Sequence, residues 1–147
     1  MSRPGLRAAA TAALVIGLDQ ATKALVRANV DRGESDPIFP AVELVNTRNR
    51  GVAFGLLEGA EVLVAVVTVV ALLALVAFFV RHRDRRLAWL PTGLLLGGAL
   101  GNVIDRVRGD GVTDFIKLPV WPAFNLADMA ITFGVLALIY VLEGRRE

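Results

Sequence analysis

The sequence has no cysteine, a single histidine and only two serines. Without cysteine, disulfides, thiolate metal sites and cysteine nucleophiles are all excluded. One histidine, His82, cannot build a zinc hydrolase site, and no H-E-x-x-H motif occurs. Ser2 and Ser35 lie outside the apolar runs, so a serine nucleophile inside a membrane is not expected. If the protein is a hydrolase, carboxylates are left to do the chemistry.

Charge is also scarce. Of the 147 residues, 55% are hydrophobic and 20% charged, with a net charge of +2. This balance is unusual for a small soluble domain and typical of a protein that crosses a membrane several times. The length predicts a single membrane domain comprising residues 1–147. The arginines cluster in short blocks between apolar runs, which favours membrane orientation over nucleic-acid binding.

Four apolar runs approach the roughly twenty residues that a membrane span requires. The predicted spans are about residues 6–26, 62–80, 87–107 and 125–142. The first run resembles a secretory signal, but it continues past Asp19 and Lys23 without a convincing cleavage site, so we expect it to be retained. The predicted fold class is therefore all-α integral membrane, with four transmembrane helices.

Four spans place both termini on one side of the membrane. The strongly basic stretch 81–86 and the terminal arginines share that side, which predicts that it is the cytoplasm. The loops over residues 28–57 and 108–123 then lie outside. Turn-forming residues at 31–37 predict turns at the start of the first loop, and residues 38–45 have the composition of a strand. We expect a small extracytoplasmic β-element here, lying on the membrane surface.

Glycines recur at helical spacing in the third predicted span. They are Gly93, Gly97, Gly98 and Gly101. Such glycines usually let neighbouring helices pack closely, and we expect that role here.

Polar side chains gather where the predicted spans reach the outer face. They include Asp19, Lys23, Asn102, Asp105, Arg106, Asp114, Asn125 and Asp128. An ionisable group near hydrocarbon is costly and usually has a task. Two aspartates that share a proton can activate water, because one accepts its proton while the other donates to the carbonyl oxygen.

Most of these residues also have a structural interpretation. Asp19 and Lys23 stand at i and i+4, which suits an intrahelical ion pair as well as substrate contact. Asn125 and Asp128 have the spacing of a capping box. For Asp105, which is next to Arg106, we favour a structural ion pair.

Asp114 is the exception. In an extended segment its carboxyl shares a face with Val112 and Ile116. Apolar surroundings raise a carboxyl pKa, as a general acid requires.

Five stretches together resemble a known family. They are D-Q-A-T-K (19–23), N-R-G-V-A-F (49–54), G-N-V-I-D-R (101–106), V-T-D-F (112–115) and F-N-L-A-D (124–128). Each is weak alone, but in this order the set resembles the lipoprotein signal peptidase (signal peptidase II) family, aspartyl enzymes of the bacterial inner membrane. The resemblance covers nearly the whole chain. Thr113 and Met129 stand where an aliphatic residue and a serine are more usual.

The resemblance implies an intramembrane aspartyl endopeptidase that cleaves diacylglyceryl-modified prolipoproteins just before the lipidated cysteine. It implies Asp114 and Asp128 as the catalytic pair, although Asp105 remains an alternative member. The residues expected to bind substrate or support the site are Asp19, Lys23, Asn49, Gly51, Phe54, Asn102, Asp105, Arg106 and Asn125.

No metal or cofactor is implied. The expected partners are prolipoprotein signal peptides and membrane lipids, without nucleic acid, and the chain is expected to be a monomer. Its expected location is the bacterial cytoplasmic (inner) membrane, as a multi-pass protein with its active site at the outer face.

Two other functions deserve comparison with this one. A lipid-head-group transferase would use Asp105, Asp114 and Asp128 to hold Mg²⁺, but no phosphate-binding loop accompanies them. A proton-coupled transporter would usually show internal repeats and a site near the bilayer midplane, and neither is visible.

Overall fold

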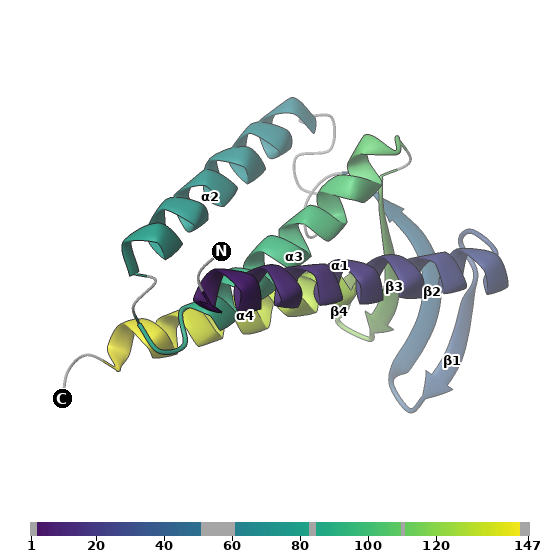
Figure 1. Cartoon of the computed structure of the whole chain (residues 1–147). Coiled ribbons are helices and arrows are strands. Elements are labelled where there is room, and N and C mark those ends of the chain that lie inside the picture. The colour runs from purple at the N-terminus through teal and green to yellow at the C-terminus, as the bar shows by residue number, and fades with distance from the viewer. Residues whose placement is uncertain (1–2, 51–60, 83–84, 110, 145–147) are drawn as a thin grey trace.

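The computed structural model of the chain describes residues 3–50, 61–82, 85–109 and 111–144. The elements within these residues are α1 (Arg3–Asn29), β1 (Ser35–Phe39), β2 (Val42–Asn49), α2 (Glu61–His82), α3 (Trp89–Val107), β3 (Val112–Leu118), β4 (Trp121–Phe124) and α4 (Leu126–Glu143). Each helix coincides with one predicted span. The protein is therefore mostly helical with a small antiparallel sheet (Figure 1).

The helix α3 packs against the three other helices, most extensively against α1 and α4. Its glycines make this approach possible, as predicted. A Cβ atom at Gly93 would lie 2.5 Å from the Thr11 Cβ of α1, and one at Gly98 would lie 2.5 Å from the Ala127 carbonyl oxygen of α4. Neither distance is tolerable, so larger residues would push α1 or α4 away from α3.

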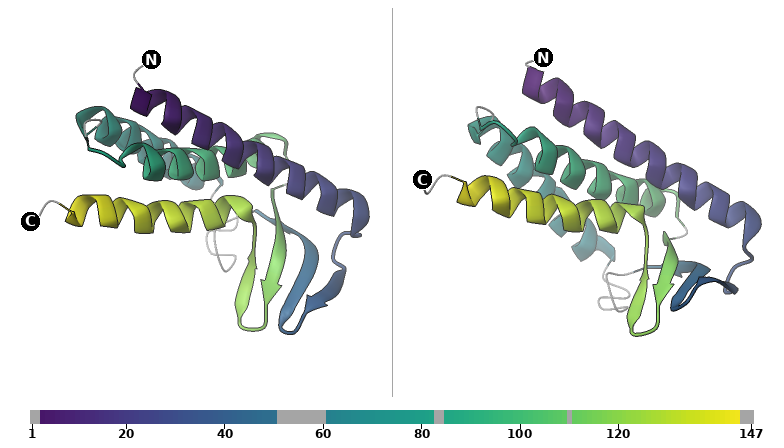
Figure 2. Two further views of the ribbon diagram at one scale, coloured as in Figure 1. Left: turned by 60° about the horizontal axis from the view of Figure 1, so that its bottom comes forward. Right: turned by 90° about the horizontal axis from the view of Figure 1, so that it is seen from below.

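Two helices, α1 and α4, are long and apolar enough to cross a membrane, and α2 contributes the shorter apolar stretch Val66–His82. Large apolar side chains on these helices are exposed, among them Leu14, Leu73 and Leu136. Both ends of the chain lie at the end of the helices opposite the sheet (Figure 2). The apolar helices fit a membrane protein.

The sheet is larger than the sequence predicted. Its strand order is β1-β2-β3-β4, and every neighbouring pair is antiparallel. The hairpin of β1 and β2 confirms strands in the first loop. The second loop also forms strands, which the sequence did not indicate as partners of the first. The expectation of turns at residues 35–37 was wrong, because β1 is an edge strand and tolerates Pro37.

The sheet is anchored on the last turns of α1. Val26 and Val30 pack against Phe115 of β3, and Leu44 and Ile116 flank this cluster. This contact fixes β3 beside the ends of the helices, where the predicted polar residues lie.

Candidate active site

Five elements bring the predicted polar residues together at the sheet end of the helices. These residues are Asp19 and Lys23 of α1, Asn49 of β2, Asn102, Asp105 and Arg106 of α3, Asp114 of β3, and Asn125 and Asp128 at the start of α4. They form two adjoining groups, one around Asp114 and Asp128 and one around Lys23. Two other predicted residues, Gly51 and Phe54, lie outside the described part of the chain.

Asp114 is buried in β3 and held by two amides. Asn125 Nδ2 donates to its Oδ1 at 2.7 Å, and Asn49 Nδ2 donates to its Oδ2 at 3.1 Å. Asn49 reaches it because the register pairs Asn49 with Val112, two residues before Asp114 and on the same face. Burial raises the pKa of Asp114 to about 7, and the charge of Asp128 raises it too, against the lowering effect of the amide hydrogen bonds. This carboxyl is suited to hold a proton at neutral pH.

Asp128 lies in the first turn of α4 and completes the predicted capping box. The Asn125 side chain accepts from the Asp128 main-chain N–H at 3.0 Å, and the Asp128 Oδ2 accepts from the Asn125 N–H at 3.2 Å. The positive end of the helix dipole favours a negative charge here. Capping does not occupy the whole carboxylate, because its Oδ1 accepts a separate bond from Asn102 Nδ2 at 2.9 Å.

Asn102 and Asn125 connect the two aspartates. Asn125 Nδ2 donates both to Asp114 and to the Oδ1 of Asn102 (3.1 Å), while Asn102 Nδ2 donates to Asp128. Asn125 therefore orients Asp114, Asn102 orients Asp128, and the two asparagine side chains are hydrogen-bonded to each other. The result is a continuous hydrogen-bonded chain from β3 to α4.

Lys23 is fully buried and satisfies all three of its N–H donors. Its Nζ lies 2.8 Å from Asp19 Oδ2, 3.0 Å from Asp105 Oδ2 and 2.9 Å from Asn102 Oδ1. This confirms the predicted Asp19–Lys23 ion pair, and it pairs Asp105 with the same lysine, a partner that the sequence interpretation, which considered Asp105 beside Arg106, did not name. Because Asn102 Oδ1 faces Lys23, its Nδ2 must face Asp128, so the lysine fixes which way the amide points.

Asp19 also holds the start of α4. Its Oδ1 accepts from the Ala127 main-chain N–H at 3.0 Å, one of the donors that a helix start leaves unpaired. A Cβ at Gly101 would lie 2.7 Å from Asp19 Oδ2, so glycine is what admits the carboxylate between the helices. Gln20, which the sequence interpretation missed although it lies within the first motif, donates to Asp19, Asp105 and the Gly101 carbonyl.

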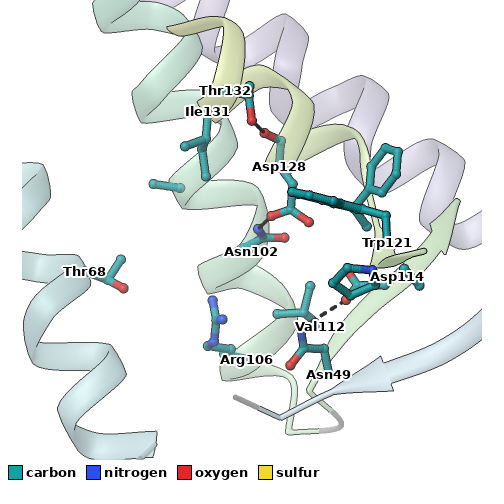
Figure 3. A pocket seen from close by; sticks show the side chains of 14 residues that line it. Asn49, Thr68, Asn102, Arg106, Val112, Asp114, Trp121, Asp128, Ile131 and Thr132 are labelled. Atoms are coloured by element: carbon teal, nitrogen blue, oxygen red, sulfur yellow. Dashed lines mark hydrogen bonds between the residues drawn. The ribbon is translucent and has the colours of Figure 1, made fainter. Parts of the chain in front are cut away.

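A cavity of about 410 Å³ opens over the two aspartates. Figure 3 shows Asp114 and Asp128 on its wall, with Asn49 and Arg106 below them and Thr68 of α2 across the gap. The rest of the lining is Ala99, Asn102, Val112, Trp121, Pro122, Ala123, Phe124, Ile131 and Thr132. An apolar cavity with a few convergent polar groups is the usual form of a binding site.

The three aspartates first considered as a magnesium site do not converge. Asp105 faces Lys23 and Gln20, whereas Asp114 and Asp128 face the cavity. Over the described residues, no group of three His, Cys, Asp or Glu side chains is arranged to hold a metal ion. The geometry favours carboxylate acid–base chemistry.

Known proteins match along nearly the whole chain. Residues 11–143 match the family described as signal peptidase (SPase) II. The lipoprotein signal peptidase of Moorella thermoacetica is 46% identical over 133 residues, covering 89% of each chain, and that of Halothermothrix orenii is 43% identical over 130 residues, covering 88% of this chain and 90% of the relative. A solved bacterial membrane enzyme, determined in meso at 2.3 Å, matches with a TM-score of 0.85 and 34% identity over 93% of this chain and 87% of that one.

Proposed function

The chain belongs to the signal peptidase II family, and from this premise we propose that Asp114 and Asp128 are its catalytic pair. The activity is that of a peptidase which cleaves signal peptides from prolipoproteins in the bacterial inner membrane. One observation carries the residue assignment. Both carboxylates line a single cavity and are held by neutral amides, while Asp105 is held by a lysine.

The two aspartates take different roles. Asp114, whose pKa burial raises to about 7, holds the proton and is the general acid. Asp128, at the positive end of α4, is ionised and is the general base. The interaction between the two charges keeps the pair from ionising together.

Hydrolysis then proceeds in two steps. A water bound between the pair gives a proton to Asp128 as its oxygen attacks the scissile carbonyl carbon, and Asp114 protonates the carbonyl oxygen. The resulting diol breaks its C–N bond, with Asp128 returning a proton to the leaving nitrogen and a diol hydroxyl returning one to Asp114. Both carboxyls end in their starting states, so no cofactor is consumed.

Most of the remaining site residues act by positioning. Asn49 and Asn125 orient Asp114, while Lys23 orients Asn102, which in turn orients Asp128. Arg106 lines the cavity and is assigned to substrate contact. Asp19 and Asp105 balance the lysine charge, and Asp19 also secures the start of α4.

The substrate enters sideways from the bilayer. We assign all four helices of this single membrane domain as spans, with the termini in the cytoplasm and the sheet at the outer face, which agrees with the placement of both ends opposite the sheet (Figure 2). The cavity lies between Thr68 of α2 and Ile131 of α4, which leaves an apolar entrance for a signal helix and its diacylglyceryl chains. The scissile bond, just before the lipidated cysteine, then meets the pair. The protein acts as a monomer.

One assay tests this function. Purified full-length protein is incubated with a diacylglyceryl-modified prolipoprotein, and the products are analysed by mass spectrometry, with and without EDTA. We expect a free signal peptide and a new N-terminus at the lipidated cysteine in both conditions. A matched prolipoprotein without the lipid is the control and should be cleaved far more slowly. Cleavage abolished by EDTA would contradict the dyad mechanism.

A further inference from the structure

A second cavity lies over the sheet and adjoins the cavity that holds the aspartate pair. Its volume is about 460 Å³. Asn49, Pro122 and Ala123 line both cavities, so the two are direct neighbours. Figure 3 shows Asn49 beside Asp114, on the side of the aspartate pair that faces β2. We refer to this second cavity as the sheet cavity.

The sheet cavity lies on the same face of the sheet as Asp114. Thr47, which lines it, is directly opposite Asp114 in the register of β2 and β3, so the two side chains share a face. Asn49 is two residues further along β2 and donates to Asp114 Oδ2, so its side chain lies on that face as well. Ser35 extends the lining to β1, the strand next to β2. The sheet cavity therefore leads from the aspartate pair across β2 to β1.

The lining of the sheet cavity is polar, whereas the cavity over the aspartates has mainly apolar walls. A carboxylate, an ammonium group and two hydroxyl groups contribute to it, from Glu34, Lys117, Ser35 and Thr47. Glu34, Ser35 and Lys117 are exposed and Thr47 is half-buried, so these groups are accessible to water. Apolar chains gain little from such a lining, and polar polypeptide keeps its hydrogen bonds there. The sheet cavity therefore suits a hydrated peptide segment better than a signal helix or an acyl chain.

We propose that the sheet cavity binds the residues that follow the lipidated cysteine of the substrate. This inference rests on the proposed function, in which the signal helix reaches the aspartate pair from the bilayer. The chain beyond the scissile bond then leaves on the side of the sheet, opposite the two ends of this protein (Figure 2). The path from β3 to β1 crosses two strand spacings, about 10 Å, which roughly three extended residues span. The segment bound here is thus the first few residues after the cysteine.

The test compares two substrates and two variants of the purified full-length protein in detergent. The short substrate is a diacylglyceryl-modified signal peptide whose chain ends, as an amide, at the lipidated cysteine. The long substrate continues after the cysteine with Ser-Ser-Asn-Ser. Ser35→Trp fills the sheet cavity from an exposed position on β1. Ile38→Trp is the matched control, because Ile38 is also exposed on β1 and lines neither cavity.

We expect the wild type to cleave the long substrate with a kcat/KM at least about tenfold above that of the short one, since binding energy from a remote segment lowers the barrier at the reacting bond. Ser35→Trp should remove most of this difference by slowing the long substrate alone, whereas Ile38→Trp should keep it.

Equal kcat/KM values for the two substrates in the wild type would overturn the proposal, and this comparison needs no variant. An unchanged preference in folded Ser35→Trp would overturn it as well. An equal loss on both substrates in that variant would also do so, because the cavity would then hold a part of the substrate that both share. If the proposed function itself fails, the wild type cleaves neither substrate, which is distinct from cleavage of both at equal rates.

Discussion

The Lys23 group and the Asp114–Asp128 group adjoin each other, and both are built from aspartates and the same asparagine, with Asp19, Asp105 and Asp114 buried and Asp128 half-buried. In the first, Asp19 and Asp105 both contact the Lys23 ammonium within 3.0 Å. In the second, Asp114 and Asp128 receive their hydrogen bonds from asparagine side chains and a main-chain N–H. We infer that the carboxylates matched by a cation serve the structure, whereas the pair held by amides beside an open cavity is the one that exchanges a proton.

Asn102 is the boundary between the two groups. Its Oδ1 accepts from Lys23, and its Nδ2 donates to Asp128. The Lys23 group therefore contributes to the Asp114–Asp128 group through geometry, by fixing one amide. Changes on either side of this boundary should have different consequences.

The largest effect on activity is expected from replacing Asp114 or Asp128, the two aspartates held by asparagine amides. Asp114→Asn and Asp128→Asn keep the shape of the side chain but remove a proton-transfer group. Each should lower kcat/KM by about a hundred- to ten-thousandfold. Cleavage kinetics on a diacylglyceryl-modified prolipoprotein measure this, with circular dichroism as the folding control. Near wild-type rates in either folded variant would remove that residue from the pair.

The largest effect on stability is expected from replacing Lys23, the buried cation. Lys23→Met leaves two carboxylates buried without their partner, and breaking a buried ion pair in this way costs about 3–5 kcal/mol. The free energy of unfolding in detergent should fall by that amount. Lys117→Met, at an exposed position, is the matched control and should change it by no more than about 0.5 kcal/mol. Equal effects in the two variants would mean that Lys23 does not hold the buried group together.

Asn102, the boundary residue, should have a large effect on activity although it is not one of the two aspartates of the proposed pair. Asn102→Ala removes the donor to Asp128, and a hydrogen bond to a charged group is worth about 1.5–3 kcal/mol, or roughly ten- to a hundredfold in rate. The loss should appear in kcat rather than in KM, because Asn102 acts on Asp128. A variant with a changed KM and an unchanged kcat would indicate substrate binding instead.

Replacing Gly101 should destabilise the fold, whereas replacing Gly17 should not. A Cβ in Gly101→Ala would press on Asp19 Oδ2, at an expected cost of about 1–3 kcal/mol in unfolding free energy. Gly17→Ala, in α1, meets nothing within 4 Å and should be neutral or slightly stabilising. Thermal unfolding of the two variants makes the comparison. A stable Gly101→Ala would show that Asp19 can move without loss.

The smallest effect is the pH response of Asp114. Its pKa of about 7 implies that the protonated acid is lost as pH rises through 7, so kcat should fall about tenfold between pH 6 and 8. The same group stabilises the fold fully below its ordinary pKa of 3.8, and this stability is lost as pH rises through about 7. The unfolding free energy of Asp114→Asn should lack this pH-dependent contribution. An identical pH profile in wild type and variant would contradict the raised pKa.

The helices and most of the site were predictable from local patterns. Apolar runs located α1 to α4, i,i+4 spacing predicted the Asp19–Lys23 pair, and the Asn125–Asp128 spacing predicted the capping box. Alternation placed Asp114 on a strand face. These features depend on residues close together in the sequence, where periodicity carries the information.

The contacts between distant segments were not predictable from pattern. The pairing of β2 with β3 depends on a register between residues more than sixty positions apart, and no local signal records it. The bonds from Gln20 to Asp105 and from Arg27 to Thr113 likewise follow from helix packing. The sequence also favoured an ion pair for Asp105 without identifying Lys23 as its partner.

The most direct test of the central claim compares two isosteric variants across the boundary. Asp114→Asn and Asp105→Asn are purified, their folded fractions are measured, and cleavage of a diacylglyceryl-modified prolipoprotein is expressed per folded molecule. We predict a loss of at least about a hundredfold for Asp114→Asn, and for Asp105→Asn a lower unfolding midpoint with a rate within about tenfold of wild type. The reverse, with Asp114→Asn active and a well-folded Asp105→Asn inactive, would contradict the account and make Asp105 the partner of Asp128.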